Sequence, residues 1–210
     1  MKQAIRAVIF DMDGTLYESD ALDGQYAEAV DAYIAGQRGL SKAQAREVFG
    51  AKWAALSEQL GHPPTSTGTM VALGFDLAEW IAWRDARLRP EDVLHRDDRL
   101  RSFLQELKAR YVLAVVTNNS VEMARRTLGA IGIDDVFDHV LTIQDMGLIK
   151  PDPEIYRRAA EAIGVPPAQC LSVGDRPHID LEPAAAAGMQ TFCSPGPQGL
   201  YGLGEMLDLD

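Results

Sequence analysis

Five short apolar runs, separated by segments of helical pattern, constrain the fold of this 210-residue chain more than any other feature. Runs of this length, bounded by turn residues, are typical of buried strands. Because helical segments separate them, they predict an α/β fold in which crossover helices connect the strands of a parallel sheet. The predicted strands are Ala7 to Phe10, Val112 to Val116, Val140 to Ile143, Leu171 to Val173 and Gln190 to Cys193.

The gap between the first two runs is about a hundred residues long, although a crossover connection needs only about a dozen. Residues in this gap carry helix start signals of the capping-box type, at Ser41 with Gln44 and at Asp76 with Glu79. The stretch 61–68, GHPPTSTG, is too rich in proline, glycine and threonine to continue a helix. The gap therefore predicts an insertion built of helices.

We expect residues 19–94 to form this all-helical subdomain and residues 1–18 and 95–210 to form the α/β core. One predicted helix of the subdomain carries two tryptophans and two arginines on one face. Such a face could hold a base or sugar and a second anion, but tryptophans packed in the subdomain's own core beside solvated arginines are the commoner arrangement. The four residues are Trp80, Trp83, Arg84 and Arg87.

Composition and charge exclude several kinds of partner. The chain has 20 Lys and Arg against 31 Asp and Glu, and no basic cluster is long enough to follow a phosphate backbone, so we expect no nucleic acid partner. The apolar runs are too short to span a bilayer, and two carboxylates interrupt the N-terminal segment where a secretory signal needs an apolar core. We therefore expect a cytoplasmic protein without a membrane partner, either a monomer or a homodimer. Cys170 and Cys193 fit neither a metal site nor a disulfide framework and are expected to be small buried residues.

Polar residues follow the predicted strands at the points where the strands end. Because ligands of open α/β sheets bind at the carboxyl ends of strands, Asp11, Thr117, Lys150 and Asp175 can converge in space. Asp11 and Asp13 alternate along an extended segment, about 6 to 7 Å apart, so they can flank one reacting atom. One carboxylate can then attack a phosphorus atom while the other serves the leaving group, although DxDG alone fits an acidic turn equally well.

Two further segments offer groups for an anion. Thr117 to Ser120 combine a hydroxyl with free backbone N–H groups at a helix start, which suits phosphate oxygens and a helix N-cap at once. Lys150 precedes Pro151, which disfavours helical geometry at the lysine, so we expect the next helix to start with Asp152 as cap and Pro153 at its first position. A cation is needed here, because a phosphate at 4 Å from a carboxylate meets about 4 kcal/mol of repulsion per pair of unit charges at an effective dielectric of 20.

Carboxylates at the same strand ends suit a magnesium ion, which commonly takes only one or two protein carboxylates. We expect Asp11 and Asp175 as ligands, with the backbone carbonyl of Asp13 as a third. Asp180 could bind the ion through water, orient Lys150, or cap the helix that follows it.

These four segments, in this order, resemble the four motifs of the haloacid dehalogenase superfamily: DMDGTL, the Thr of VVTNN, the Lys of KPDP, and GDRPHID. The resemblance implies a Rossmann-like core with a helical cap that closes over the site, and a magnesium-dependent phosphatase that hydrolyses a small phosphorylated metabolite through an aspartyl-phosphate. It implies that Asp11 is the nucleophile and Asp13 the general acid and base. It also implies that Thr117 and Asn118 contact the phosphate, that Lys150 stabilises charge and that Asp175 is a magnesium ligand.

The last motif departs from the family pattern. Relatives often carry a small hydroxyl residue where this chain has Arg176 followed by Pro177, and often Asn where it has Ile179, which puts the coordination by this loop in doubt. His178 is expected to be solvated.

Other functions compete with the phosphatase. A dehalogenase would need neither a proton donor such as Asp13 nor a metal ligand such as Asp175, and an imine-forming phosphonate hydrolase would need a cap lysine, for which only Lys42 and Lys52 are available. A sugar-phosphate mutase of the same superfamily remains open. A phospho-accepting receiver-like signalling module also uses acidic residues, Thr and Lys at sheet ends, but has no need for the insertion.

Overall fold

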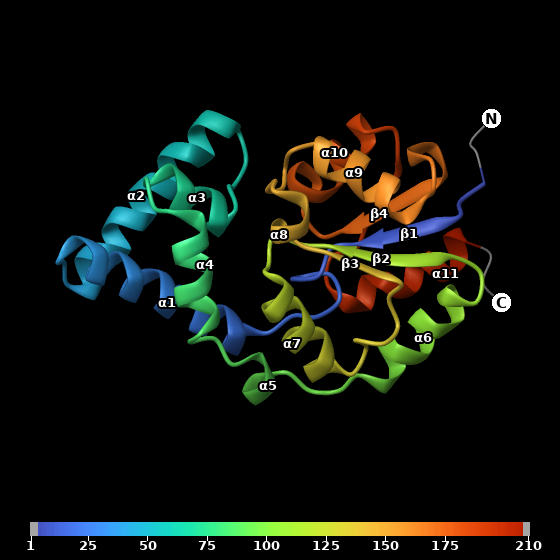
Figure 1. Cartoon of the computed structure of the whole chain (residues 1–210), viewed down its shortest axis with the longest axis horizontal. Coiled ribbons are helices and arrows are strands. Elements are labelled where there is room, and N and C mark those ends of the chain that lie inside the picture. The colour runs from blue at the N-terminus through green and yellow to red at the C-terminus, as the bar shows by residue number, and fades with distance from the viewer. Residues whose placement is uncertain (1–3, 208–210) are drawn as a thin grey trace. The chain divides into compact units, whose positions relative to one another are not determined.

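The computed structural model describes residues 4–207. It contains a five-stranded sheet of order β3-β2-β1-β4-β5 in which all neighbouring strands are parallel, so the predicted α/β fold is confirmed (Figure 1). The strands are β1 (Ala7–Phe10), β2 (Val112–Val116), β3 (His139–Leu141), β4 (Cys170–Gly174) and β5 (Gln190–Cys193).

The third strand is shorter than predicted. It ends at Leu141, because the backbone N–H and the hydroxyl of Thr142 both donate to Asp145 and turn the chain into helix α8 (Ile143–Met146). Ile143, which the apolar run placed in the strand, therefore begins a helix. The residue is still buried, which is why its hydrophobicity alone could not distinguish the two elements.

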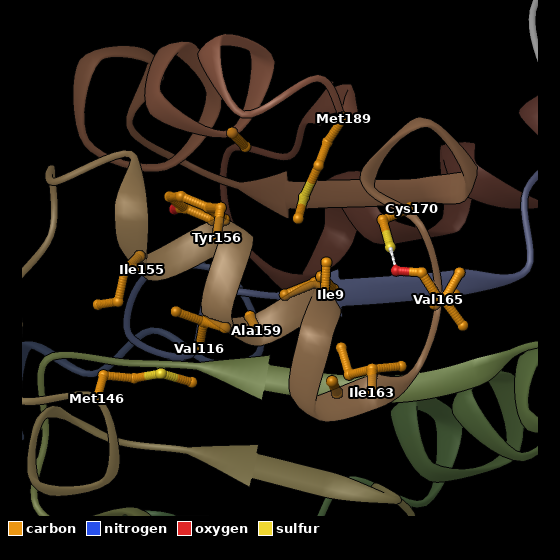
Figure 2. Close-up of a cluster of buried hydrophobic side chains, with 14 residues drawn as sticks. Ile9, Val116, Met146, Ile155, Tyr156, Ala159, Ile163, Val165, Cys170 and Met189 are labelled. Carbon is orange, nitrogen blue, oxygen red and sulfur yellow. Dashed lines mark hydrogen bonds between the residues drawn. The ribbon is translucent and has the colours of Figure 1, made fainter.

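Helices cover both faces of the sheet. On one face, α9 (Glu154–Ile163) packs Ile155, Tyr156 and Ala159 against Ile9 and Val116 (Figure 2). The opposite face lies against α6 (Asp98–Lys108) and α7 (Val121–Ile131) (Figure 1). The core is completed by α10 (Glu182–Ala186) and α11 (Gly202–Met206). Because β1 is covered on both faces, all of its residues are buried, as expected for the central strand of a parallel sheet.

The chain forms two compact units: Ser19–Val93 is one, and the rest of the described chain, 4–18 with 94–207, is the other. The outermost residues assigned to the core, 1–3 and 208–210, lie outside the described residues. The unit Ser19–Val93 consists of α1 (Asp20–Arg38), α2 (Lys42–Leu60), α3 (Ser66–Ala72), α4 (Leu77–Asp85) and α5 (Pro90–Val93). It is helical throughout, with short connections.

Local sequence signals explain where these helices begin. Ser41 and Gln44 form the predicted capping box of α2, and the carboxylate of Asp76 accepts a hydrogen bond from the N–H of Glu79 at the start of α4. The stretch 61–68 ends α2, as predicted, but its last three residues already belong to α3. The reason is that Thr65 caps this helix by accepting a 2.9 Å hydrogen bond from the N–H of Gly68.

The helical unit has an aromatic core. Trp80 is fully buried and its ring lies 5.1 Å from that of Tyr33, centroid to centroid, which confirms tryptophan packing here. The expected solvation of Arg84 is wrong: this side chain is fully buried, because it donates to Asp85 at 2.7 Å and to the hydroxyl of Tyr26 at 2.7 Å. A buried cation is tolerated when it is paired and hydrogen-bonded within the same unit.

The two cysteines differ in exposure. Cys170 is buried in the core, as predicted, but the expected burial of Cys193 is wrong. It lies on β5, the edge strand of the sheet, where residues alternate between half-buried and exposed. Among the described residues, no helix has the length and apolar character needed to cross a membrane.

Candidate active site

Three neighbouring strands end level with one another. Phe10 at the end of β1 pairs with Val115 of β2 and with Val173 of β4. The residues that follow these strands, which include Asp11 and Asp175, therefore emerge at one edge of the sheet. This register explains why residues far apart in the sequence can form one site.

Three carboxylates gather at this edge. One side-chain oxygen each from Asp11, Asp175 and Asp180 lies within 4.8 Å of the others. Asp11 and Asp180 are buried, whereas Asp175 is half-buried. The close approach depends on Gly14, which has a φ of +81° and whose position would place a Cβ atom only 2.8 Å from Oδ2 of Asp175. The cluster therefore contains both predicted carboxylate ligands and adds Asp180.

Lys150 lies between two of these carboxylates. Its ammonium group donates to Oδ1 of Asp11 and, at 2.7 Å, to Oδ1 of Asp180, and only 1% of the residue is exposed. Burial disfavours the charge of the lysine, but Asp11 and Asp180 outweigh that cost and raise its pKa, so the ammonium stays protonated. For Asp11, burial and the neighbouring Asp180 raise the carboxyl pKa, while Lys150 opposes the rise.

One oxygen of Asp11 has no partner in the described chain. Its Oδ2 atom is buried and makes no hydrogen bond, whereas Oδ1 accepts from Lys150. A buried acceptor of this kind is costly unless something else satisfies it. The free oxygen thus marks the point at which a ligand or a reacting atom would approach.

The backbone of Lys150 is fixed by Asn118. The side-chain oxygen of Asn118 accepts a 2.8 Å hydrogen bond from the N–H of Lys150, and its amide nitrogen donates to the carbonyl of Lys150 at 3.3 Å. This residue, expected as a phosphate contact, thus uses its side chain to hold the lysine loop. The helix after the loop begins at Glu154, later than predicted, although Asp152 does accept a 2.9 Å hydrogen bond from the N–H of Glu154.

The segment after β2 is a helix start, as predicted. The hydroxyl of Ser120 accepts a 3.0 Å hydrogen bond from the N–H of Met123 and caps α7. Thr117 is fully buried, and its hydroxyl oxygen accepts from the N–H of Asn119 at 3.1 Å. The strand end and the helix N-terminus are therefore only a few residues apart, which suits the binding of an anion.

Asp13 is exposed, unlike Asp11, and both of its carboxylate oxygens accept hydrogen bonds. The hydroxyl of Tyr17 donates to Oδ1, and the amide of Asn119 donates to Oδ2 at 2.7 Å. The sequence pattern does not single out Asn119 as a site residue. Its place directly after Thr117 and Asn118 at a strand end is the only signal that could have found it.

The loop after β4 contributes a second cation. Nε of Arg176 lies 4.0 Å from Oδ1 of Asp175 and 4.0 Å from Oδ2 of Asp180. Burial disfavours the charge of this guanidinium, but the surrounding carboxylates, Asp11 first among them, raise its pKa. In the sequence, Arg176 stands out only as a departure from the family pattern.

Asp180 accepts hydrogen bonds from Lys150 and from the backbone of its own loop. Besides Lys150, it accepts a 3.1 Å hydrogen bond from the N–H of Arg176. Its expected alternative role as a helix cap is wrong, because α10 begins at Glu182 and Leu181 stands at the cap position. His178 is exposed, as predicted, and its Nδ1 atom lies 2.8 Å from Oε1 of Glu182.

Comparison with known proteins places these features in a family. A family model for haloacid dehalogenase-like hydrolases matches residues 5–188. The chain is 29% identical over 199 residues to a glyceraldehyde 3-phosphate phosphatase of Methanopyrus kandleri, covering 89% of this chain and 82% of the relative. It is 26% identical over 195 residues to the pyrophosphatase PpaX of Halalkalibacterium halodurans, with the same coverage. A 37% match to a phosphoserine phosphatase of Thermus thermophilus spans only 42% of this chain and 36% of the relative.

Solved structures agree with the fold. The crystal structure of a phosphatase of this superfamily from Thermococcus onnurineus matches with a TM-score of 0.65 at 26% identity, over 97% of this chain and 98% of that one. The structure of a dehalogenase matches with a TM-score of 0.61 at 20% identity, which shows a similar fold only. The family model spans residues of both the core and the inserted helices and confirms the family expected from the four motifs. The chain belongs to the haloacid dehalogenase-like hydrolases.

Proposed function

We propose that this hydrolase is a magnesium-dependent phosphatase that hydrolyses a small phosphorylated metabolite through an aspartyl-phosphate on Asp11. The observation that carries the proposal is the acidic cluster itself. Three carboxylates gather at the carboxyl ends of parallel strands, two of them accept hydrogen bonds from a buried lysine, and one oxygen of Asp11 is left without a partner among the described residues. Two relatives matched over 89% of this chain, a glyceraldehyde 3-phosphate phosphatase and a pyrophosphatase, support hydrolysis of a phosphate bond.

The residues at the site fit a magnesium ion. Carboxylate and carbonyl oxygens are the donors that Mg²⁺ prefers, and the unpartnered Oδ2 of Asp11 is one such donor. The proposed ligands are Asp11, Asp175 and the backbone carbonyl of Asp13. When bound, the cation would offset the charge of a phosphate dianion and polarise its oxygens.

In the first half-reaction, an oxygen of Asp11 attacks the phosphorus atom of the substrate. The bond between phosphorus and the ester oxygen breaks, and the leaving oxygen takes its electron pair and a proton from Asp13. Lys150 keeps its proton and offsets negative charge next to the nucleophile, since Asp11 and Asp180 raise its pKa. We propose that Thr117 and the N–H groups at the start of α7 contact the transferred phosphoryl group.

In the second half-reaction, Asp13 acts as a base. It removes a proton from a water molecule, whose oxygen attacks the phosphorus atom. The bond from phosphorus to Asp11 breaks, the electron pair returns to the Asp11 carboxylate, and inorganic phosphate is formed. Asp13 is then protonated again for the next cycle.

The helical unit Ser19–Val93 is proposed to be the cap that selects the substrate. Its helices form a compact unit of their own with an aromatic core. Fold alone does not identify the substrate, because the same fold hosts many activities.

The proposal is tested with purified protein, p-nitrophenyl phosphate and a panel of phosphorylated metabolites. Turnover should disappear after exhaustive chelation with EDTA and return with Mg²⁺. Full activity after chelation would show that the metal takes no part in the mechanism. No turnover of any phosphate ester would rule out a phosphatase. A requirement for a bisphosphate activator would instead indicate a mutase, and one stable phosphate per chain would indicate a receiver-like module.

A further inference from the structure

Asp13 is the most exposed of the carboxylates at the site, yet its position is fixed. An exposed carboxylate on an extended segment can normally rotate among several side-chain conformations. Here each of its two oxygens accepts a hydrogen bond from a different part of the chain, Oδ1 from Tyr17 and Oδ2 from Asn119. Two donors on opposite oxygens restrict both side-chain torsions of Asp13.

Both donors are themselves held in place. Tyr17 stands at the end of a tight loop that the backbone closes, since the N–H of Gly14 donates to the carbonyl of Tyr17 at 2.9 Å and Asp13 forms a backbone bridge with Tyr17. Asn119 is only 6% exposed. Its N–H donates to the hydroxyl of Thr117, and its carbonyl accepts a 3.3 Å hydrogen bond from the N–H of Ile143. The backbone of each donor is therefore held by hydrogen bonds within the core.

We propose that Tyr17 and Asn119 are positioning residues that clamp Asp13 for both proton transfers, an inference that rests on the proposed function. In the first half-reaction the clamp holds the protonated carboxyl of Asp13 where the ester oxygen departs. In the second it holds the carboxylate where water enters. Such placement matters because proton transfer requires a donor and an acceptor within about 2.6 to 3.2 Å. Neither residue contacts the phosphoryl group in this scheme, so neither contributes to substrate binding.

A purely structural role for these hydrogen bonds predicts different behaviour. If the two donors only tie together the loops after β1 and β2, their removal lowers stability and disturbs binding and chemistry together. If they position Asp13, their removal lowers the chemical rate and leaves binding and folding intact. The split between kcat and KM therefore separates the two roles.

The experiment compares Tyr17→Phe, Asn119→Ala and the double variant with the wild type. Each single change should lower kcat for an alkyl phosphate about tenfold, and the double variant about a hundredfold, because misplacing a general acid and base costs rate in this range. KM, inhibition by orthovanadate and the melting temperature should not change. Tyr111→Phe is the matched control: it removes a tyrosine hydroxyl that donates to the carbonyl of Leu207, and its kcat should equal that of the wild type.

Pre-steady-state kinetics give a second measurement. With p-nitrophenyl phosphate, the good leaving group needs little protonation, so the Tyr17→Phe and Asn119→Ala variants should release nitrophenolate in a rapid burst followed by slow turnover. The burst reports accumulation of the phosphoenzyme when water is poorly activated. Asn119→Asp places a like charge beside Asp13 and should lower kcat more than Asn119→Ala does.

Unchanged kcat in the double variant would overturn the clamp, and so would parallel losses of kcat, vanadate binding and stability. These outcomes differ from failure of the proposed function. If the wild type turns over phosphate esters and Asp13→Asn does so far more slowly, while the Tyr17 and Asn119 variants resemble the wild type, only the clamp is wrong. If the wild type turns over no phosphate ester, the proposed function is wrong and the clamp falls with it.

Discussion

At the scale of single residues, the site brings together charged side chains that depend on their oppositely charged partners. Lys150 is buried against Asp11 and Asp180, and Arg176 lies close to Asp175 and Asp180. Removing one partner of such a buried pair leaves the other charge uncompensated, which costs more than the pair contributes when intact. Variants that keep the shape of a side chain but change its chemistry are therefore the most informative here.

The two carboxylates of the DMDGTL motif, Asp11 and Asp13, should respond differently to replacement by asparagine. Asp11→Asn removes the nucleophile and should abolish phosphoenzyme formation. Asp13→Asn keeps the nucleophile but loses the proton donor and base, which are typically worth about 10² to 10⁴-fold in rate. With p-nitrophenyl phosphate, Asp13→Asn should release up to about one equivalent of nitrophenolate rapidly and then turn over slowly, whereas Asp11→Asn should give no burst. Similar steady-state turnover in both variants would contradict this division of roles.

Arg176 should weaken the binding of a divalent cation, because it competes for the same carboxylates. Replacing it by alanine removes a positive charge near Asp175, and Mg²⁺ should bind about three- to tenfold more tightly by titration calorimetry. Solvent screening of the partly exposed arginine keeps the effect this small. Arg176→Lys should behave like the wild type, and Arg157→Ala, which removes an exposed arginine paired with Glu154, serves as the control. Weaker Mg²⁺ binding in Arg176→Ala would show that the arginine supports the metal site.

At the scale of elements, the site depends on strands that end in register and on helices that fix the loops after them. Helix α9 follows the Lys150 loop directly and packs Ile155 and Tyr156 against the sheet (Figure 2). The loop of Lys150 is therefore anchored by Asn118 on one side and, on the other, by a helix with one face buried against the sheet. The position of the lysine is a property of this packing as much as of its own sequence.

Truncating the first buried residue of α9 should destabilise the core. Ile155 is fully buried, and Ile155→Ala should lower the free energy of unfolding by about 2 to 5 kcal/mol, while Ile155→Val should cost about 0.5 to 1.5 kcal/mol. Urea denaturation followed by circular dichroism measures both. Val121→Ala, at a position that is 37% exposed, should have a much smaller effect. Equal losses at the two positions would contradict the packing described for α9.

At the scale of the whole molecule, the chain has two compact units, and the acidic cluster lies entirely within the unit that holds the sheet. Its residues come from segments that are far apart in sequence, before and after the helical insertion. The site is therefore assembled only when this unit folds, and any ligand that binds it stabilises the folded state over the unfolded chain.

Magnesium should therefore raise the melting temperature of the protein. At a concentration of about 100 times its dissociation constant, a ligand adds about 2.7 kcal/mol to the free energy of unfolding. The shift should be visible by differential scanning calorimetry and should be reversed by EDTA. Asp175→Asn should reduce the shift strongly, whereas Asp92→Asn, in α5 outside the cluster, should keep it. An equal shift in both variants would place the binding of the ion elsewhere.

Much of the architecture could be predicted from local sequence. The strands β1, β2 and β5 lie where their apolar runs predict, and Ser41 with Gln44 forms the expected capping box. Such features depend on hydrogen bonds and hydrophobic patterns within a few residues, which the sequence contains in full. The family also follows from four short motifs, because their residue types occur along the chain in the order expected for that family.

The partners of polar side chains, by contrast, were decided only by tertiary structure. Asn119 donates to Asp13 across 106 positions of the sequence, and Asn118 holds the backbone of Lys150 across 32. Arg84 is buried because Tyr26, 58 positions away, accepts its hydrogen bond. The sequence by itself determined which elements form and which reactive groups they carry. Which of those groups touch one another depends on the register of the strands and the packing of the helices, because hydrogen bonds and charge pairs act over a few ångströms in space regardless of separation along the chain.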